Sequence, residues 1–447
     1  MADGGLDSLR SEIAACGAVH QLGQVAGVAR GVLRVVGGGN WCLGDRVRLL
    51  GMNGRTAGGE IVGLEENGAT ILSDDVAEGA RIGDRVLHLG RCRIMPDAGW
   101  IGRIVDPFGQ PLDGRPLRNG RSECALRASP PPAGERRRLG PRLETGVSVF
   151  NTLLPLVRGQ RIGIFAGSGV GKSSLLGKFA RRVESDVTVI ALIGERGREL
   201  REFVETVLGP EGMARSVIVA STSDQSPLLR RRCAWTAMAV AEYFRDQGCQ
   251  VLLLADSITR FAEAHREVAL AAGEPPSLRG FPPSTSHLIM SLAERAGPGA
   301  GRSGDITAVF TVLVAGSDMD EPVADILRGV LDGHVVMDRQ IAERGRYPAI
   351  DLLRSVSRSL PQAANDAQNA LISDARRLLG AYDRAELMIQ AGLYVAGSDP
   401  MIDAAVRVWP LLDGFLAEDE SADSERSFQR LAQILEKAKD QGMASAA

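Results

Sequence analysis

The sequence predicts an α/β protein in three parts, and three observations support this. Short β-rich runs separated by glycine and Asn/Asp turns occupy the first fifth of the chain, longer apolar runs alternate with helical stretches in the middle, and the tail is largely helical. Continuous apolar strands that alternate with helices are typical of a parallel sheet covered on both faces. We therefore expect a small β-barrel (24–92), a parallel-sheet domain (93–360, with a connector at 93–143) and an α-helical domain (361–447), preceded by a terminal segment (1–23).

The N-terminal segment and the barrel differ in periodicity. Leu6, Leu9 and Ile13 share one face of a short amphipathic helix, which would be either a docking helix for a partner or a frayed end. The barrel prediction depends on four short runs whose spacing fits a small all-β domain. These runs are residues 31–36, 46–50, 59–64 and 69–72.

The connector ends in three consecutive prolines at 130–132 and the basic run 136–138. Proline cannot donate a ladder hydrogen bond, so we expect a semi-rigid linker here. Beyond it, five apolar runs predict the strands of the sheet, and a turn at 397–400 interrupts the helical tail. The runs are 161–165, 187–193, 216–220, 251–255 and 308–314.

A glycine-rich loop follows the first predicted strand and opens a helix. Its glycines allow backbone N–H groups to converge on an anion, Lys172 supplies a charge for the β and γ phosphates, and the Ser173 hydroxyl can bind Mg²⁺. The helix adds the positive end of its dipole. The loop therefore predicts a nucleotide phosphate site made by Ala166, Gly167, Ser168, Gly169, Val170, Gly171, Lys172, Ser173 and Ser174.

Two further strands end in residues suited to nucleotide hydrolysis. Asp256 closes the apolar run 251–255, as expected for a carboxylate that holds Mg²⁺ beside a phosphate loop. Glu195 and Arg196 follow the run 187–193, and ligands of open α/β sheets bind at the carboxyl ends of strands. Glu195 could then activate water and Arg196 bind the γ phosphate, although a surface ion-pair cluster would explain the same residues.

Composition narrows the function classes. Net charge is −3 and only 4% of residues are aromatic, so neither a nucleic-acid footprint nor stacking platforms are expected. The six cysteines form no CxxC pair, which indicates neither a disulfide framework nor a zinc site. No run of about 18 apolar residues occurs. These features predict a soluble protein of a reducing compartment.

The motifs together resemble the catalytic subunits of the rotary ATPase superfamily, and within it the type III export ATPases, with the flagellar branch most similar. The resemblance is carried by the loop 165–173, by 194–196, by 256–261 and by 347–351 with 355–358, in that order along residues 25–415. It implies a RecA-like central domain, ATP and Mg²⁺ as cofactors, and ATP hydrolysis that energises the export of flagellar proteins.

Residue roles follow from that resemblance. It implies that Arg196 and Arg260 approach the γ phosphate, that Tyr347 stacks on adenine, and that Arg358 is an arginine finger acting in a neighbouring subunit. Ser257 stands where some relatives have Asn, which leaves a side-chain contact there open, and no second aromatic wall for adenine can be assigned. Because one chain carries both Glu195 and Arg358, a ring of identical copies could complete every site, so we expect a homohexamer.

The resemblance also implies partners: a negative regulator or stator-like protein at the N-terminal segment, a central stalk protein near the 397–400 turn, export chaperones and substrates, and an export gate at the membrane. That turn could equally be a plain interhelical connection. Two alternative functions remain at this point. A virulence-type injectisome ATPase shares every motif, whereas a hexameric RNA translocase should show aromatic residues on its barrel, where residues 25–90 contain only Trp41.

Overall fold

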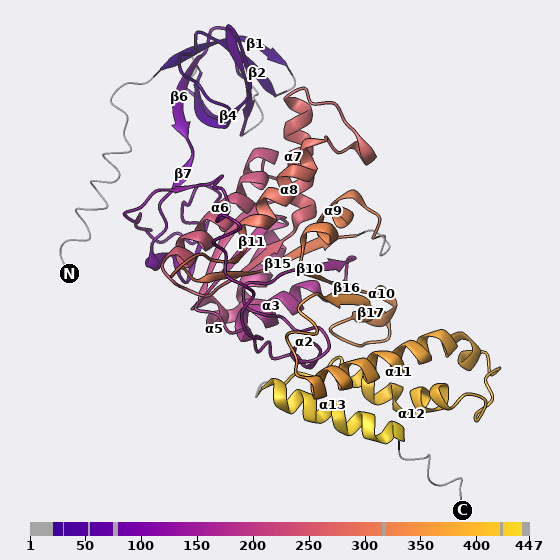
Figure 1. Ribbon diagram of the computed structural model, residues 1–447. Helices are drawn as coiled ribbons and strands as arrows, with labels where there is room; N and C mark the ends of the chain where they lie inside the picture. The colour runs from indigo at the N-terminus through magenta and orange to yellow at the C-terminus, as the bar shows by residue number, and fades with distance from the viewer. Residues whose placement is uncertain are drawn as a thin grey trace, which may run out of the picture.

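The computed structural model describes residues 21–29, 31–51, 54–74, 79–314, 319–420 and 423–439. Its three parts confirm the predicted fold class: a closed barrel and a helical unit lie at opposite ends of a central sheet domain (Figure 1). The terminal segment for which we expected a docking helix lies outside the described residues, apart from the last three positions.

The barrel closes in the order β1-β2-β5-β4-β3-β6. Alternate residues along its strands point inward, which produces the period-two burial seen in β3 and β5. Val35, Val47, Ile61 and Ile71 form the centre of its own small core. The strands are β1 (Leu22–Ala29), β2 (Val32–Val36), β3 (Asp45–Leu50), β4 (Thr56–Glu65), β5 (Gly68–Ser73) and β6 (Arg85–Arg91).

The central sheet runs in the order β17-β16-β10-β15-β13-β11-β12-β8. It is parallel from β16 to β8, while β17 and the short β14 pair antiparallel to their neighbours. The strands are β8 (Arg103–Val105), β10 (Arg161–Ala166), β11 (Val187–Glu195), β12 (Ser216–Thr222), β13 (Val251–Asp256), β14 (Gly297–Pro298), β15 (Asp305–Leu313), β16 (Gly333–Met337) and β17 (Ile350–Ser357).

Helices cover both faces of this sheet. Leu175, Leu176 and Phe179 of α3 pack on one face, and the buried side of α6 packs on the other. The helices are α2 (Ser148–Asn151), α3 (Lys172–Arg182), α4 (Gly197–Glu202), α5 (Gly209–Met213), α6 (Pro227–Asp246), α7 (Ile258–Ala271), α8 (Ser284–Arg295), α9 (Pro322–Val330) and α10 (Arg339–Glu343), with a π-helical turn at Phe203–Leu208 and 3-10 turns at Ala98–Trp100 and Leu278–Gly280.

The connector differs from the linker that we expected. Its β8 extends the central sheet, and β7 (Arg93–Ile94) pairs with β9 (Cys124–Ala125). Arg136 donates to the Pro131 carbonyl and to Glu294, so the segment after the prolines is fixed to the central domain. Arg137 likewise forms an ion pair with Asp305, and the segment therefore does not act as a free spacer.

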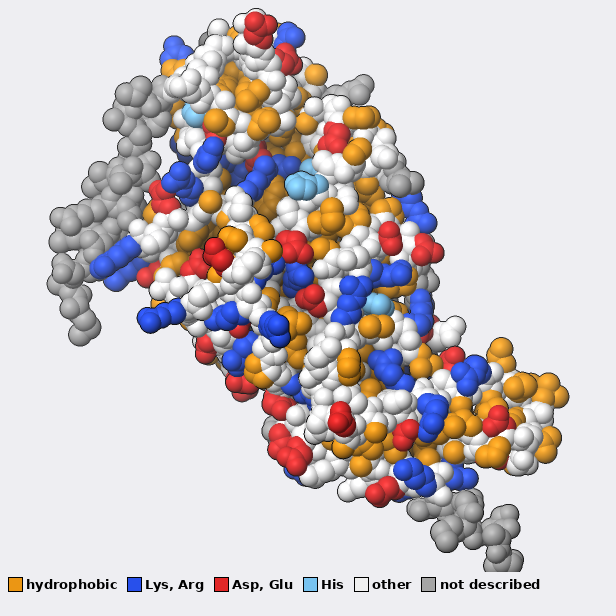
Figure 2. Space-filling model, viewed as in Figure 1, with side chains coloured by type: hydrophobic (Ala, Val, Ile, Leu, Met, Phe, Trp, Pro, Cys, Tyr) orange, Lys and Arg blue, Asp and Glu red, His pale blue; other side chains and the backbone are white. Residues whose placement is uncertain are grey.

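The C-terminal unit is formed by α11 (Asp366–Gln390), α12 (Pro400–Phe415) and α13 (Ser424–Lys439). The predicted turn lies between α11 and α12, where Asp399 caps α12 through the backbone N–H groups of Met401 and Ile402. Hydrophobic side chains gather at this outer end of the unit (Figure 2). Among them, Leu387, Leu393 and Val395 are each more than two-thirds exposed. None of the helices in the described ranges is long and apolar enough to cross a membrane.

Candidate active site

The glycine-rich loop joins β10 to α3 and opens into a cavity of about 650 Å³. Gly169 and Gly171 have φ angles of +78° and +86°, a backbone conformation that favours glycine. Gly171 caps α3 without a side-chain hydrogen bond. The first N–H groups of the helix are thus left for an anion, as a phosphate site requires.

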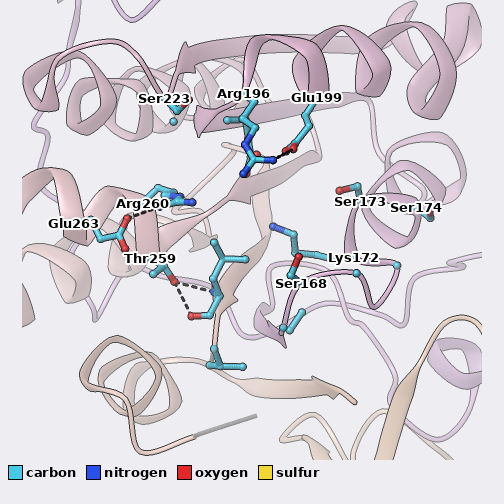
Figure 3. Close-up of a pocket in the computed structure, with 18 of the residues that line it drawn as sticks. Ser168, Lys172, Ser173, Ser174, Arg196, Glu199, Ser223, Thr259, Arg260 and Glu263 are labelled. Atoms are coloured by element: carbon cyan, nitrogen blue, oxygen red, sulfur yellow. Dashed lines mark hydrogen bonds and ion pairs between the residues drawn. The ribbon is translucent and has the colours of Figure 1, made fainter. Parts of the chain in front are cut away.

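Most of the predicted site residues line this cavity, and they come from the loop, the end of β11 and two helices (Figure 3). Lys172 extends into it from α3, Arg196 from the loop after β11, and Arg260 from α7. Arg196 forms an ion pair with Glu199, with 3.2 Å between Nη1 and Oε1, and Arg260 forms one with Glu263 at 2.9 Å. Both cations are at least 44% exposed, so these pairs could be exchanged for a phosphate at small cost.

Asp256 lies buried at the end of β13 and is held by two donors. Lys172 Nζ and the Thr311 hydroxyl both contact its Oδ1, the latter at 2.8 Å. Ser173, Glu195 and Asp256 line a second hollow of about 210 Å³ beside the main cavity. One hydroxyl and one carboxylate oxygen suit Mg²⁺, which keeps waters and phosphate oxygens as its other ligands. No larger cluster of metal-binding side chains occurs in the described part of the chain.

Glu195 ends β11 between these two hollows. Burial, together with the nearby charge of Asp256, raises the pKa of Glu195 to about 7, while Lys172 opposes the shift. A carboxyl group with a pKa near neutral pH is well suited to accept a proton from water. The arrangement can therefore supply both phosphate binding and a general base.

Tyr347 and Pro348 form a wall beside the phosphate loop. A Cβ atom built on Gly171 would lie 3.0 Å from Tyr347 Cδ1, and the two residues line a cavity of about 360 Å³ with Ser174, Leu175 and other loop residues. The aromatic face is half exposed and available for stacking. Tyr347 is the one aromatic residue among the described residues of this cavity.

Arg358 lies apart from the other predicted site residues. It follows β17, donates from Nη2 to the Arg328 carbonyl at 3.2 Å, and is not among the described residues that line the main cavity. Ser257 is fully buried and caps α7 through the Arg260 N–H, so its hydroxyl is used within the chain. The sequence analysis missed Thr311, although one hydroxyl in the apolar run 308–314 was a usable signal.

A phosphate loop after β10, a carboxylate at the end of β13 and a general base at the end of β11, all at one edge of the sheet, define a P-loop nucleoside triphosphatase. The model of the ATP synthase alpha/beta family, nucleotide-binding domain, matches residues 146–357, and that of the T3SS EscN ATPase C-terminal domain matches residues 364–433. The chain belongs to the ATP synthase alpha/beta family, in the branch that contains flagellum-specific ATP synthases and type III secretion ATPases, and it is an ATP-hydrolysing enzyme.

Relatives match along almost the whole chain. The Flagellum-specific ATP synthase of Caulobacter vibrioides is 44% identical, over 96% of this chain and 99% of that protein. The Type 3 secretion system ATPase of Xanthomonas euvesicatoria is 40% identical, over 96% and 98%. Among solved structures, the assembled ATPase EscN of the enteropathogenic E. coli type III secretion system has a TM-score of 0.86 at 34% identity and covers 92% of this chain and 100% of that chain.

Proposed function

We propose that this protein is the ATPase of a flagellar type III export apparatus and works as a homohexamer with a catalytic site at each subunit interface. The observation that carries the proposal is the separation of two half-sites on one chain. Lys172 and Glu195 line the main cavity and Asp256 lines the hollow beside it, whereas Arg358 is not among the described residues that line either one. A finger that acts in trans requires this separation.

Each residue then has a role at the interface. Lys172 and the loop backbone bind the β and γ phosphates, Arg196 and Arg260 approach the γ phosphate, and Glu195 accepts a proton from the attacking water. Mg²⁺ held by Ser173 and Asp256 would neutralise charge on the phosphate oxygens. Tyr347 stacks on adenine, and Arg358 stabilises charge in the neighbouring site.

The proposed assembly also includes partners. A solved relative is described as the assembled ATPase EscN in complex with its central stalk EscO, at 35% identity and a TM-score of 0.83. By analogy, a stalk protein would contact the outer end of the C-terminal helices, and a negative regulator would bind the N-terminal segment. Chaperones, substrates and an export gate complete the proposed peripheral complex at the cytoplasmic side of the membrane.

An injectisome ATPase is the second candidate, because the Xanthomonas relative and EscN share this architecture. Loss of swimming after gene deletion favours the flagellar function, and retained swimming favours the injectisome. An RNA translocase is disfavoured, since Trp41 is buried in the barrel and stacks on His88. Stimulation of ATP turnover by RNA would instead support the RNA translocase.

The test of shared sites is ATP turnover against protein concentration. Wild type should show a steep rise as rings form, and Arg358→Ala should lose about 10³-fold in rate while it still assembles. A mixture of Lys172→Ala and Arg358→Ala should recover part of the activity, because some interfaces then pair an intact loop with an intact finger. Activity proportional to concentration, without recovery in the mixture, would indicate independent monomer sites and overturn the ring.

A further inference from the structure

Arg346 lies between the base-side wall of the nucleotide site and the C-terminal helices, and it is only 8% exposed. Its Nη1 donates to the Pro348 carbonyl at 3.3 Å and its Nη2 to the Ile350 carbonyl at 2.8 Å. Both acceptors lie within three residues of Tyr347 on its C-terminal side. The guanidinium therefore binds the turn that carries Tyr347 and fixes the backbone just after this residue.

The same guanidinium faces Asp413 in the last turn of α12. Arg346 Nε lies 3.0 Å from Asp413 Oδ1, and the aspartate side chain is 26% exposed. Removing one partner of a buried ion pair strongly destabilises the folded protein. We therefore infer that this carboxylate stabilises the guanidinium in its observed position. Lysine could not replace it, because a single ammonium cannot contact two carbonyls and a carboxylate in one plane.

On its other side, the Tyr347 turn contacts the phosphate loop. The ring lies against Gly171, and Tyr347 and Pro348 line the 360 Å³ cavity beside Ser174. A shift of the Pro348 carbonyl would therefore move the surface on which a base stacks, without moving Lys172 or Asp256. The effect of such a shift should fall on nucleotide affinity and not on the chemical step.

We propose that the Arg346–Asp413 pair is a positioning device that couples the C-terminal helices to the base side of the nucleotide site. This inference rests on the proposed stacking role of Tyr347. Asp413 is 13 residues from Pro400, the first residue of α12, which corresponds to about 20 Å of helix. A partner that tilts α12 from its exposed outer end would thus move Asp413 and, through Arg346, the turn that carries Tyr347.

The experiment compares Asp413→Asn with Glu386→Gln. Glu386 forms another ion pair across this domain boundary, 3.5 Å from Arg344, and within the described part of the chain it forms no ion pair with residues 346–350. Asp413→Asn should raise KM for ATP about tenfold with kcat within about twofold, which corresponds to the loss of one charge-assisted contact. Asp413→Glu should recover much of the affinity. Competition by inorganic tripolyphosphate, which has no base, should be unchanged in every variant.

The variant Tyr347→Ala distinguishes a failure of the proposed stacking role from a failure of the proposed coupling. An unchanged KM in Tyr347→Ala would refute the stacking role, and the coupling with it. A raised KM in Tyr347→Ala with an unchanged KM in Asp413→Asn would overturn the coupling alone, as would equal effects of Asp413→Asn and Glu386→Gln. If Asp413→Asn does not fold, as judged by thermal unfolding, Arg346→Lys replaces it with the same expected rise in KM.

Discussion

At the scale of single residues, the site depends on carboxyl groups in contrasting surroundings. Asp256 accepts hydrogen bonds from Lys172 and Thr311, and its carboxylate oxygens are suited to bind a metal. Burial instead raises the pKa of Glu195 to about 7. Two carboxyl groups with different surroundings can divide metal binding and proton transfer between them.

His265 provides a prediction of pH dependence. Its Nε2 lies 2.7 Å from the Ser284 hydroxyl, which itself donates to Glu274, and its Nδ1 faces Arg231 at 3.4 Å. Burial, with the charges of Arg231 and Arg127, lowers the pKa of His265 to about 4, although Glu274 opposes the shift. Below pH 6.5 the unfolded chain therefore binds a proton that the folded chain does not, and stability falls as pH falls.

The free energy of unfolding should decrease by about 3 kcal/mol through His265 between pH 6.5 and pH 4. His265→Gln keeps a donor for Ser284 but does not titrate, so its stability should depend less on pH over this window. Denaturant unfolding at pH 7.5 and pH 5.0 compares the two proteins. The same pH dependence in both would contradict a buried neutral histidine.

Most of the candidate site could be predicted at this scale because its residues follow strands. Glu195 and Asp256 end apolar strands, Lys172 follows one after a short loop, and parallel strands bring such positions to one edge. Arg358 could not be placed by the same logic, since its strand β17 runs antiparallel to β16. The pairing of Arg346 with Asp413 joins two domains, and no local pattern indicates it.

At the scale of secondary-structure elements, β4 of the barrel meets α6 through a buried charge cluster. Glu60, 3% exposed, contacts Arg231 at 2.8 Å and also contacts Arg232, while Arg127 lies 3.5 Å away. Glu60→Ala leaves these buried cations without their shared partner, so it should destabilise the protein by about 3–5 kcal/mol. Denaturant unfolding followed by tryptophan fluorescence measures the loss.

The matched control for this change is Glu65→Ala, an exposed carboxylate on the same strand. It should alter stability by less than about 0.5 kcal/mol. A cost for Glu60→Ala no larger than that of the control would mean that the cluster does not hold the barrel on the central domain.

The elements that the sequence analysis missed share short length or weak periodicity. β8 has three residues and is defined only by its pairing with β12, so the connector gave no signal of a strand. The basic run 136–138 was interpreted as the end of a semi-rigid linker because three prolines precede it, yet Arg137 forms an ion pair with Asp305 at 2.5 Å. Long apolar strands are predictable from composition, whereas elements fixed by distant partners are not.

At the scale of the whole molecule, the three parts form a line. The barrel lies on one side of the nucleotide site and the C-terminal helices lie on the other. The barrel reaches it through α6, whose Arg230 packs against Gly194 beside Glu195. The C-terminal helices reach it through Arg346. A ring that engages partners at both ends would therefore have a physical connection from each end to the site.

The exposed outer end of the C-terminal unit provides the prediction at this scale. Leu387 is 81% exposed and Leu393 is 74% exposed, a gathering of apolar surface that a soluble protein usually covers with a partner. Leu393→Asp should leave ATP turnover of the isolated protein within about twofold of wild type, because the residue lies in the connection between α11 and α12 and does not line the nucleotide site. The substitution should, however, impair swimming. Lys439→Gln lowers the net charge by the same one unit on α13, away from this surface, and should leave swimming intact. Normal swimming with Leu393→Asp would mean that this surface does not bind a partner needed for export.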